Sequence, residues 1–179
     1  GATITYVQSN YADPQTVQAT LSVSFTGSQT AGDLNVVVVG WNDSTAVVSS
    51  VRDTAGNNYA LAVGPTIQAG VASQSIYYAR NIVGAAAGAN TVTVTFSTAA
   101  KFPDIRIVEY SGADLVNPVD VTVAGSGSST TSSSGSVQTT TPSDLLFAAN
   151  LVQTGTTGAG TGFTQRLLTQ PDGDIAEDR

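Results

Sequence analysis

The chain has 179 residues, of which 41% are hydrophobic and 11% are charged. This length suits a single domain with a real core, while the charged fraction is less than half of the roughly 25% that is usual for soluble domains. Thirteen acidic and six basic residues give a net charge of −7, which opposes binding to nucleic acid and to anionic membrane surfaces. Cysteine and histidine are absent, which excludes disulfides, thiolate or imidazole metal sites, and Ser-His-Asp or Cys-His catalysis.

Strand patterns occur along the whole chain. Residues 20–25 alternate polar and apolar side chains, as half-buried strands do. Residues 34–39 are apolar at nearly every position and rich in valine, which predicts a central strand that is covered on both faces. Residues 75–80, 104–110 and 145–151 resemble this second pattern, and residues 90–96 resemble the first. No stretch has a convincing 3.6-residue period, so we expect almost no helix.

Turn residues such as Asp13-Pro14, Asn117-Pro118 and Pro171-Asp172-Gly173 separate these runs at short intervals, which is typical of a sandwich or barrel. Residues 1–179 are therefore predicted to form one all-β domain, a two-sheet antiparallel β-sandwich of jelly-roll type. Its core is expected to include Val36, Val38, Ile76, Val94, Phe96, Ile107, Leu146 and Phe147.

One pattern of the first half of the chain recurs in the second half. Both halves contain Thr-x-x-Asp-Leu before an apolar strand, with Asp33 and Asp144 at equivalent turn positions. This similarity predicts an internal pseudo-repeat of about residues 16–112 and 134–179, joined by a Ser/Thr/Gly-rich loop at residues 125–136.

The second copy of this pseudo-repeat is shorter than the first. We therefore expect the sandwich to lack its last strands and to leave an unpaired sheet edge. A C-terminal peptide, a neighbouring subunit or the chain's own residues 3–11 would complete the sheet, as in donor-strand complementation.

Several segments resemble a known kind of module. They are D-L-N-V-V-V-V-G-W-N-D, V-R-D-T-A-G-N-N-Y, S-I-Y-Y-A-R-N-I, I-V-E-Y-S-G and D-G-D-I-A-E-D-R, and together they cover most of the chain. They resemble a jelly-roll β-sandwich module that is repeated in large secreted and cell-surface proteins of environmental bacteria and is similar to carbohydrate-binding modules. The resemblance implies an extracellular protein, with further strands after the D-I-A-E-D-R segment. It does not identify a ligand.

The only tryptophan, Trp41, is followed by Asn42 and Asp43. Carbohydrate-binding modules stack a sugar on an exposed aromatic ring and orient it with neighbouring amide and carboxylate groups. Trp41, Asn42 and Asp43, together with the surface tyrosine Tyr78, therefore form the candidate polysaccharide site. The alternative is that Trp41 fills the core at the end of a central strand. Tyr77 and Tyr78 face opposite sides of their strand, so only one of them can be a surface platform.

Acidic residues crowd the end of the sequence. Asp172, Asp174, Glu177 and Asp178 would repel one another, and a hard cation such as calcium would relieve that repulsion. These four residues are the candidate metal ligands. Calcium is the only cofactor that the sequence suggests. The segment from Asp53 to Asn58 also carries oxygen ligands, but a hairpin turn explains the same residues.

Paired carboxylates remain the one route to hydrolysis, and they would require Glu109 to face Asp104 or Glu177. We interpret these residues as ordinary turn and edge acids, so no enzyme is predicted. The leading hypothesis is a non-catalytic extracellular binding module that attaches a secreted protein to polysaccharide. The alternative is a structural or adhesive subunit of an extracellular stalk, matrix or filament, assembled by β-strand complementation.

Overall fold

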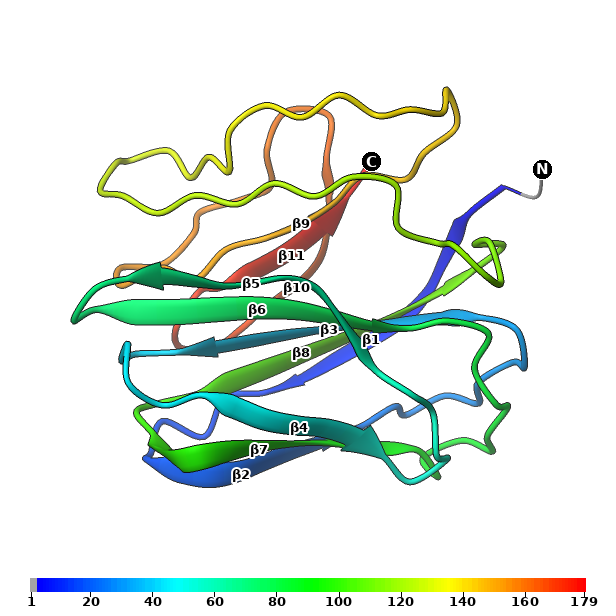
Figure 1. Cartoon of the computed structure of the whole chain (residues 1–179), viewed down its shortest axis with the longest axis horizontal. Coiled ribbons are helices and arrows are strands. Elements are labelled where there is room, and N and C mark those ends of the chain that lie inside the picture. Colours follow the sequence, from blue (N-terminus) through cyan, green and yellow to red (C-terminus); the bar gives the residue numbers. More distant parts are fainter. Residues whose placement is uncertain (1–2) are drawn as a thin grey trace.

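Across residues 3–179, which the computed structural model describes, the chain forms eleven strands and no helix. The strands make three antiparallel sheets that are stacked in layers (Figure 1). The all-β antiparallel prediction is confirmed, but the sequence did not indicate the third sheet. Within the same residues no helix is long and apolar enough to cross a membrane.

The middle layer is a five-stranded sheet with β3 at its centre. Its strands, in order across the sheet, are β1 (Thr5–Ala12), β8 (Asp104–Ser111), β3 (Leu34–Trp41), β6 (Ala72–Ala79) and β5 (Ala60–Gln68). The four valines from Val36 to Val39 are each 7% exposed or less. Successive side chains of a strand face opposite sides, so both faces of β3 must be covered, as the valine run predicted.

The second layer covers one face of the middle sheet. It consists of β2 (Gln18–Ser24), β7 (Thr91–Ala100) and β4 (Val48–Asp53). Alternate residues of β7 point inward, and Val92, Val94 and Phe96 are buried in a core that they share with Val37 and Val39 of β3. The outer face carries hydroxyl groups. The hydroxyl groups of Ser22 and Thr93 hydrogen bond across the strands at 2.7 Å, and those of Ser24 and Thr91 at 2.6 Å.

The third layer covers the opposite face of the middle sheet (Figure 1). It consists of β10 (Thr164–Leu168), β11 (Ile175–Asp178) and β9 (Phe147–Ala149). A smaller core lies between it and the middle sheet. This core contains Val36 of β3, Val108 and Tyr110 of β8, Leu167 of β10 and Ala176 of β11.

Most of the predicted core is buried. Val36, Val38, Val94, Phe96 and Ile107 are buried, while Ile76 and Phe147 are partly buried and pack against the smaller core. Leu146 is also only partly buried, and it lines a surface depression beside Arg179. The residues whose burial was overestimated, Ile76, Leu146 and Phe147, therefore all lie in or beside the third layer.

The strand pairing resembles a jelly roll in part. β1 pairs with β8, β2 with β7 and β3 with β6, but β5 pairs with β6 and not with β4. The jelly-roll connectivity therefore stays a prediction. The order β9-β11-β10 in the third sheet parallels the order β3-β6-β5 in the middle sheet. The internal repeat also stays a prediction. Residues 125–136 lie in the strand-free segment between β8 and β9.

The C-terminal strand is not at a sheet edge. β11 pairs with β10 on one side and with β9 on the other. Residues 3–11 do not complete the third sheet either, because β1 pairs with β8 in the middle sheet. β1 contacts β10 only across the layers, where Ser9 Oγ donates to the carbonyl of Arg166 at 3.0 Å. Within residues 3–179, the unpaired edges of the third sheet are those of β9 and β10.

Candidate functional site

Trp41 lies in the core, so the predicted sugar platform is wrong. Its side chain is 1% exposed, and its ring packs edge-on against Phe96 with ring centroids 5.4 Å apart. The indole N–H donates to the carbonyl of Ala46 at 3.1 Å. A ring without exposed surface cannot stack on a sugar, and the alternative reading of Trp41 as a core residue is the one that the structure supports.

Asp43 has a structural role beside Trp41. Its buried carboxylate accepts backbone hydrogen bonds from Ala46 at 2.8 Å and from Lys101 at 2.9 Å. Burial raises the pKa of Asp43, but these backbone hydrogen bonds outweigh burial and lower the pKa overall. The carboxylate therefore stays ionised, and it joins the loop after β3 to the loop after β7.

Tyr78 is on the wrong face to join Trp41. Along β6, Tyr77 packs against the larger core that contains Trp41, whereas Tyr78, the next residue, faces the opposite side of the sheet. Asn42 is partly buried at the end of β3, where its backbone N–H donates to the carbonyl of Lys101 at 2.8 Å. The structure therefore does not bring the four predicted ligand-binding residues together.

A groove of about 250 Å³ opens instead on the side of the sandwich where β4 and β5 are not paired with each other. It is referred to below as the tyrosine groove. Its lining residues are uncharged, and they are Val48, Ser49, Ser50, Val51, Tyr59 and Tyr77. Two aromatic rings and two serines thus share one concave surface.

Hydrogen bonds hold the Tyr59 ring of this groove in place. The Tyr59 hydroxyl donates to Asp53 Oδ2 at 2.8 Å and accepts a hydrogen bond from Asn35 Nδ2 at 3.2 Å. Burial raises the pKa of Tyr59, and the charge of Asp53 adds to that rise. Burial also raises the pKa of Tyr77, so both rings remain neutral phenols. Asp53 also accepts hydrogen bonds from Asn57, which supports the turn interpretation of the loop that follows it.

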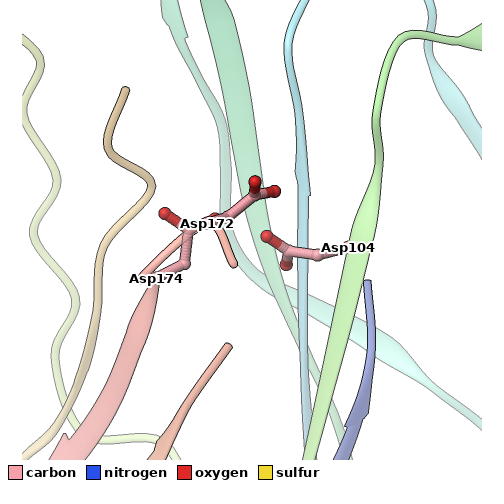
Figure 2. A group of neighbouring side chains, drawn as sticks. All are labelled: Asp104, Asp172 and Asp174. Carbon is pink, nitrogen blue, oxygen red and sulfur yellow. The ribbon is translucent and has the colours of Figure 1, made fainter. Parts of the chain in front are cut away.

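A second polar site lies between the middle sheet and the third sheet (Figure 2). Asp104 begins β8, while Asp172 and Asp174 belong to the loop between β10 and β11. These three residues each place a carboxylate oxygen within 4.8 Å of the other two. Asp13, which follows β1, accepts a hydrogen bond from the backbone N–H of Asp172 at 3.4 Å, and Gln15 Nε2 donates to both side chains. Asp13, Asp104, Asp172 and Asp174 are called the aspartate cluster below.

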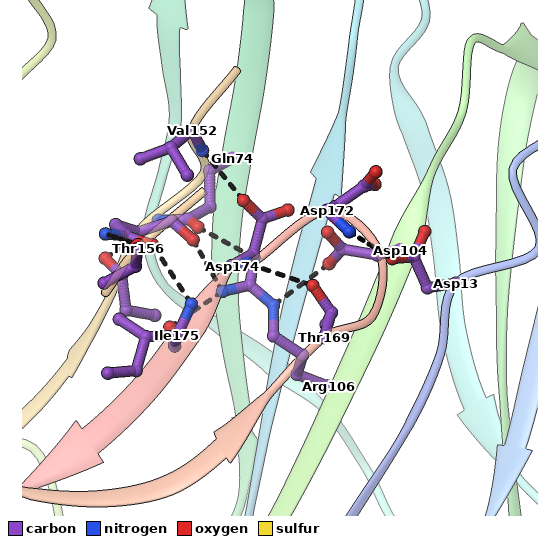
Figure 3. A network of polar contacts seen from close by, with 12 residues as sticks. Asp13, Gln74, Asp104, Arg106, Val152, Thr156, Thr169, Asp172, Asp174 and Ile175 are labelled. Atoms are coloured by element: carbon purple, nitrogen blue, oxygen red, sulfur yellow. Dashed lines mark hydrogen bonds and ion pairs between the residues drawn. The ribbon is translucent and has the colours of Figure 1, made fainter. Parts of the chain in front are cut away.

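A buried arginine connects this cluster to the third sheet (Figure 3). Arg106 Nε lies 3.0 Å from Asp104 Oδ1, and neither side chain is exposed. Arg106 Nη1 donates to the carbonyls of Asn150 at 2.6 Å and Ile175 at 2.9 Å, and Nη2 donates to Gln74 Oε1 at 3.0 Å. One guanidinium therefore bonds to β8, to β6 and to the segments around β9 and β11.

The surroundings favour the protonated forms of two carboxyl groups in the cluster. Burial raises the pKa of Asp104 well above its usual range, the Arg106 charge opposes this rise, and the neighbouring Asp174 adds to it. Burial, together with the neighbouring Asp172 carboxyl, raises the pKa of Asp13 to about 6. Burial is therefore the largest cause of both pKa shifts, and the neighbouring carboxyl groups add to it.

The four predicted calcium ligands do not form one group, so that set is corrected. Only Asp172 and Asp174 belong to the cluster. Asp178 instead pairs with Arg166 at 2.9 Å and accepts a hydrogen bond from the Tyr110 hydroxyl at 2.6 Å. Glu177 faces the other side of β11 and accepts a hydrogen bond from the backbone N–H of Gly160 at 2.8 Å.

In the sequence, Asp13 is apparent only as a turn residue and Asp104 only as a possible hydrolytic acid, so sequence reasoning missed both as members of the cluster. The period of two along D-I-A-E-D-R could have shown that Asp174 and Glu177 do not share a face. No local pattern could have shown that Asp104 comes close to Asp174, because the two residues lie far apart in the sequence, one at the start of β8 and the other in the loop before β11.

The acids considered for hydrolysis do not face one another. Asp104 and Glu109 lie on opposite faces of β8, because five positions separate them along the strand. The Glu109 carboxylate accepts a hydrogen bond from Gln8 Nε2 at 2.6 Å, while Glu177 lies in the third layer.

Comparisons with known proteins give no match to a protein-family model, a curated protein or a solved structure. The function must therefore be inferred from the tyrosine groove and the aspartate cluster themselves.

Proposed function

We propose that this chain is a non-catalytic extracellular binding module that attaches a secreted protein to a neutral polysaccharide through the tyrosine groove. The observation that carries the proposal is the groove, in which two aromatic rings and two serines line an uncharged concave surface. Sugars offer a C–H face to aromatic rings and hydroxyl groups to neutral hydrogen-bonding partners.

The position of the groove suits a polymer. Ligand pockets of about 300–1,000 Å³ enclose most of a small molecule, whereas this groove of about 250 Å³ is smaller and open at the side of the sandwich. One or two sugar rings can therefore lie in it while the rest of the chain continues over the surface. The net charge of −7 disfavours acidic polysaccharides, so the proposal specifies a neutral one.

Retention on insoluble cellulose, chitin and xylan tests this proposal. Tyr77→Leu removes the aromatic ring but keeps an apolar side chain, and we expect it to lose most of the retention that the wild-type protein shows. Tyr78→Leu is the matched control, because the neighbouring ring faces the other side of β6. The control should bind as the wild type does.

Two results would contradict the proposal. One is a wild-type protein that is not retained on any of the three polymers. The other is a Tyr77→Leu variant that is folded and retained as well as Tyr78→Leu. Circular dichroism of each variant establishes that a loss of binding is not a loss of fold.

A second candidate function is a structural or adhesive subunit that is joined to its neighbours by strand addition. The observation that favours it is the unpaired edge of β9, next to the partly buried side chains of Leu145 and Phe147. An unpaired strand edge can add a strand from another chain. Light scattering over a wide range of protein concentrations distinguishes the candidates, because this function requires growing oligomers, whereas a species that stays at 18.1 kDa contradicts it.

A further inference from the structure

The aspartate cluster holds more negative charge than its surroundings compensate. Arg106 bonds to one oxygen of Asp104, and its Nη groups are committed to two carbonyls and to Gln74. Asp104 and Asp174 have no exposed surface. Buried carboxylates are costly unless they are paired, protonated or bound to a metal, so a bound cation would take the place of the protons that burial favours in this cluster.

Two oxygen atoms show where that partner would bind. Asp104 Oδ2 and Asp174 Oδ2 are buried and accept no hydrogen bond from any residue between 3 and 179. The other oxygen of each group is fixed, since Asp104 Oδ1 accepts from Arg106 Nε and Asp174 Oδ1 accepts from the backbone N–H of Val152 at 2.8 Å. Each carboxylate is thus oriented by one oxygen while the second is left free, although buried polar atoms in proteins nearly always have a partner.

The spacing of the carboxylates suits a single hard cation. Calcium binds oxygen ligands at about 2.3–2.6 Å, so two oxygens on one ion are at most about 5 Å apart. One carboxylate oxygen from each of Asp104, Asp172 and Asp174 lies within 4.8 Å of the other two, and the three side chains are drawn in Figure 2. Asp172 is only partly buried, so water can complete the six to eight ligands that calcium takes. Magnesium fits less well, because it demands a near-ideal octahedron.

We propose that the aspartate cluster is a calcium site, with Asp104, Asp172 and Asp174 as ligands and Asp13 beside them, and that the bound ion fastens the third sheet to the middle sheet. The ligands come from the start of β8 and from the loop between β10 and β11. The ion therefore joins two layers whose shared core is small. The tyrosine groove is on the other side of the middle sheet, so this proposal does not depend on polysaccharide binding.

Calorimetric titration of the whole chain tests the proposal. Protein that has been stripped with EGTA at neutral pH is titrated with CaCl₂ and, separately, with MgCl₂, and Tm is measured in both conditions. We expect one calcium per chain, an affinity in the micromolar to millimolar range of calcium sites, and a Tm that rises by several degrees in 10 mM CaCl₂. Magnesium should bind at least tenfold more weakly.

Asp174→Asn is the informative variant. Its amide can donate a hydrogen bond to the free oxygen of Asp104, so the variant should fold and should be more stable than the wild type in EGTA. It should also lose the calcium-dependent rise in Tm. Glu177→Gln is the matched control, because it removes the same charge three residues away on the outer face of β11. This control should bind calcium as the wild type does.

Three results would overturn the proposal. The first is a wild-type Tm that does not change in 10 mM CaCl₂ at neutral pH, which would show that shared protons stabilise the cluster. The second is an equal loss of calcium binding in Asp174→Asn and Glu177→Gln. If Asp174→Asn does not fold, Asp172→Asn is tested in its place, because Asp172 is only partly buried. The third contradicting result is that Asp172→Asn binds calcium as the wild type does.

Discussion

Arg106 and Asp104 form an ion pair, with Nε 3.0 Å from Oδ1, in which neither side chain is exposed to solvent. The two residues share a face of β8 because they are two positions apart. Arg106 also donates to the carbonyls of Asn150 and Ile175, so the pair connects a strand of the middle sheet to the segments around β9 and β11.

The first prediction is that Arg106→Met is severely destabilising. It leaves the Asp104 carboxylate and two carbonyl groups without their donor, and breaking a buried pair costs about 3–5 kcal/mol. Urea denaturation followed by the fluorescence of Trp41 measures the free energy of unfolding. The exposed Arg52→Met should change it by less than about 0.5 kcal/mol. Equal effects of the two substitutions would show that the buried pair has no special role.

The second prediction concerns Trp41, whose ring fills the larger core. Trp41→Ala should lower the free energy of unfolding by about 3–5 kcal/mol, and Trp41→Phe should lower it by less, because an aromatic ring still packs against Phe96. Retention of folded Trp41→Phe on polysaccharide should equal that of the wild type. If the variant keeps the melting curve of the wild type but is no longer retained, Trp41 takes part in polysaccharide binding and this prediction is wrong.

The third prediction is a dependence of stability on pH that comes from Asp33. Burial raises the pKa of Asp33 to about 6, and the neighbouring Glu109 carboxyl adds to this rise, so the folded protein binds this proton more tightly than the unfolded chain does. The resulting stability is complete below about pH 4 and is lost as the pH rises through about 6. Tm of the wild type should therefore fall relative to that of Asp33→Asn between pH 4 and pH 7. Parallel Tm curves for the two proteins would contradict the raised pKa.

The fourth prediction compares two glycines in left-handed backbone conformations. Gly173, between two aspartates of the cluster, has φ of 73°, and a Cβ there would lie 2.7 Å from the Cα of Gly155. Gly56 has φ of 82° with no atom within 4 Å of such a Cβ. Gly56→Ala should cost about 1–2 kcal/mol through backbone strain alone, and Gly173→Ala should cost more. Thermal unfolding of both variants checks this order. If the two variants lose the same stability, the loop before β11 can move to accommodate the added Cβ.

The sequence predicts the long strands well. The valine run of β3 is apolar on both faces, and the strand is buried on both faces. The alternating residues of β7 produce one buried and one hydroxyl-bearing face. Both patterns persist over enough residues for their period to be recognised, and they depend only on neighbours along the chain.

The third sheet and the sites were harder to predict for physical reasons. β9 has three residues and β11 has four, which is too short for a period to be distinguished from chance. The exposure of Trp41 depended on whether another sheet covers that face of β3, which local sequence does not determine. The aspartate cluster brings together residues that are far apart in the sequence, so a local pattern could not show that Asp13 and Asp104 belong to it.

The position of β11 also affects how the molecule is assembled during synthesis. β9 and β10 precede β11 in the chain, but they do not pair with each other, because β11 lies between them. The third layer therefore cannot form on the ribosome until β11 has emerged, although the eight strands of the other two layers are complete long before then. Until that moment the apolar face of the nascent sandwich that contains Val36, Val108 and Tyr110 is uncovered, and it is the surface on which a chaperone or a premature contact would act.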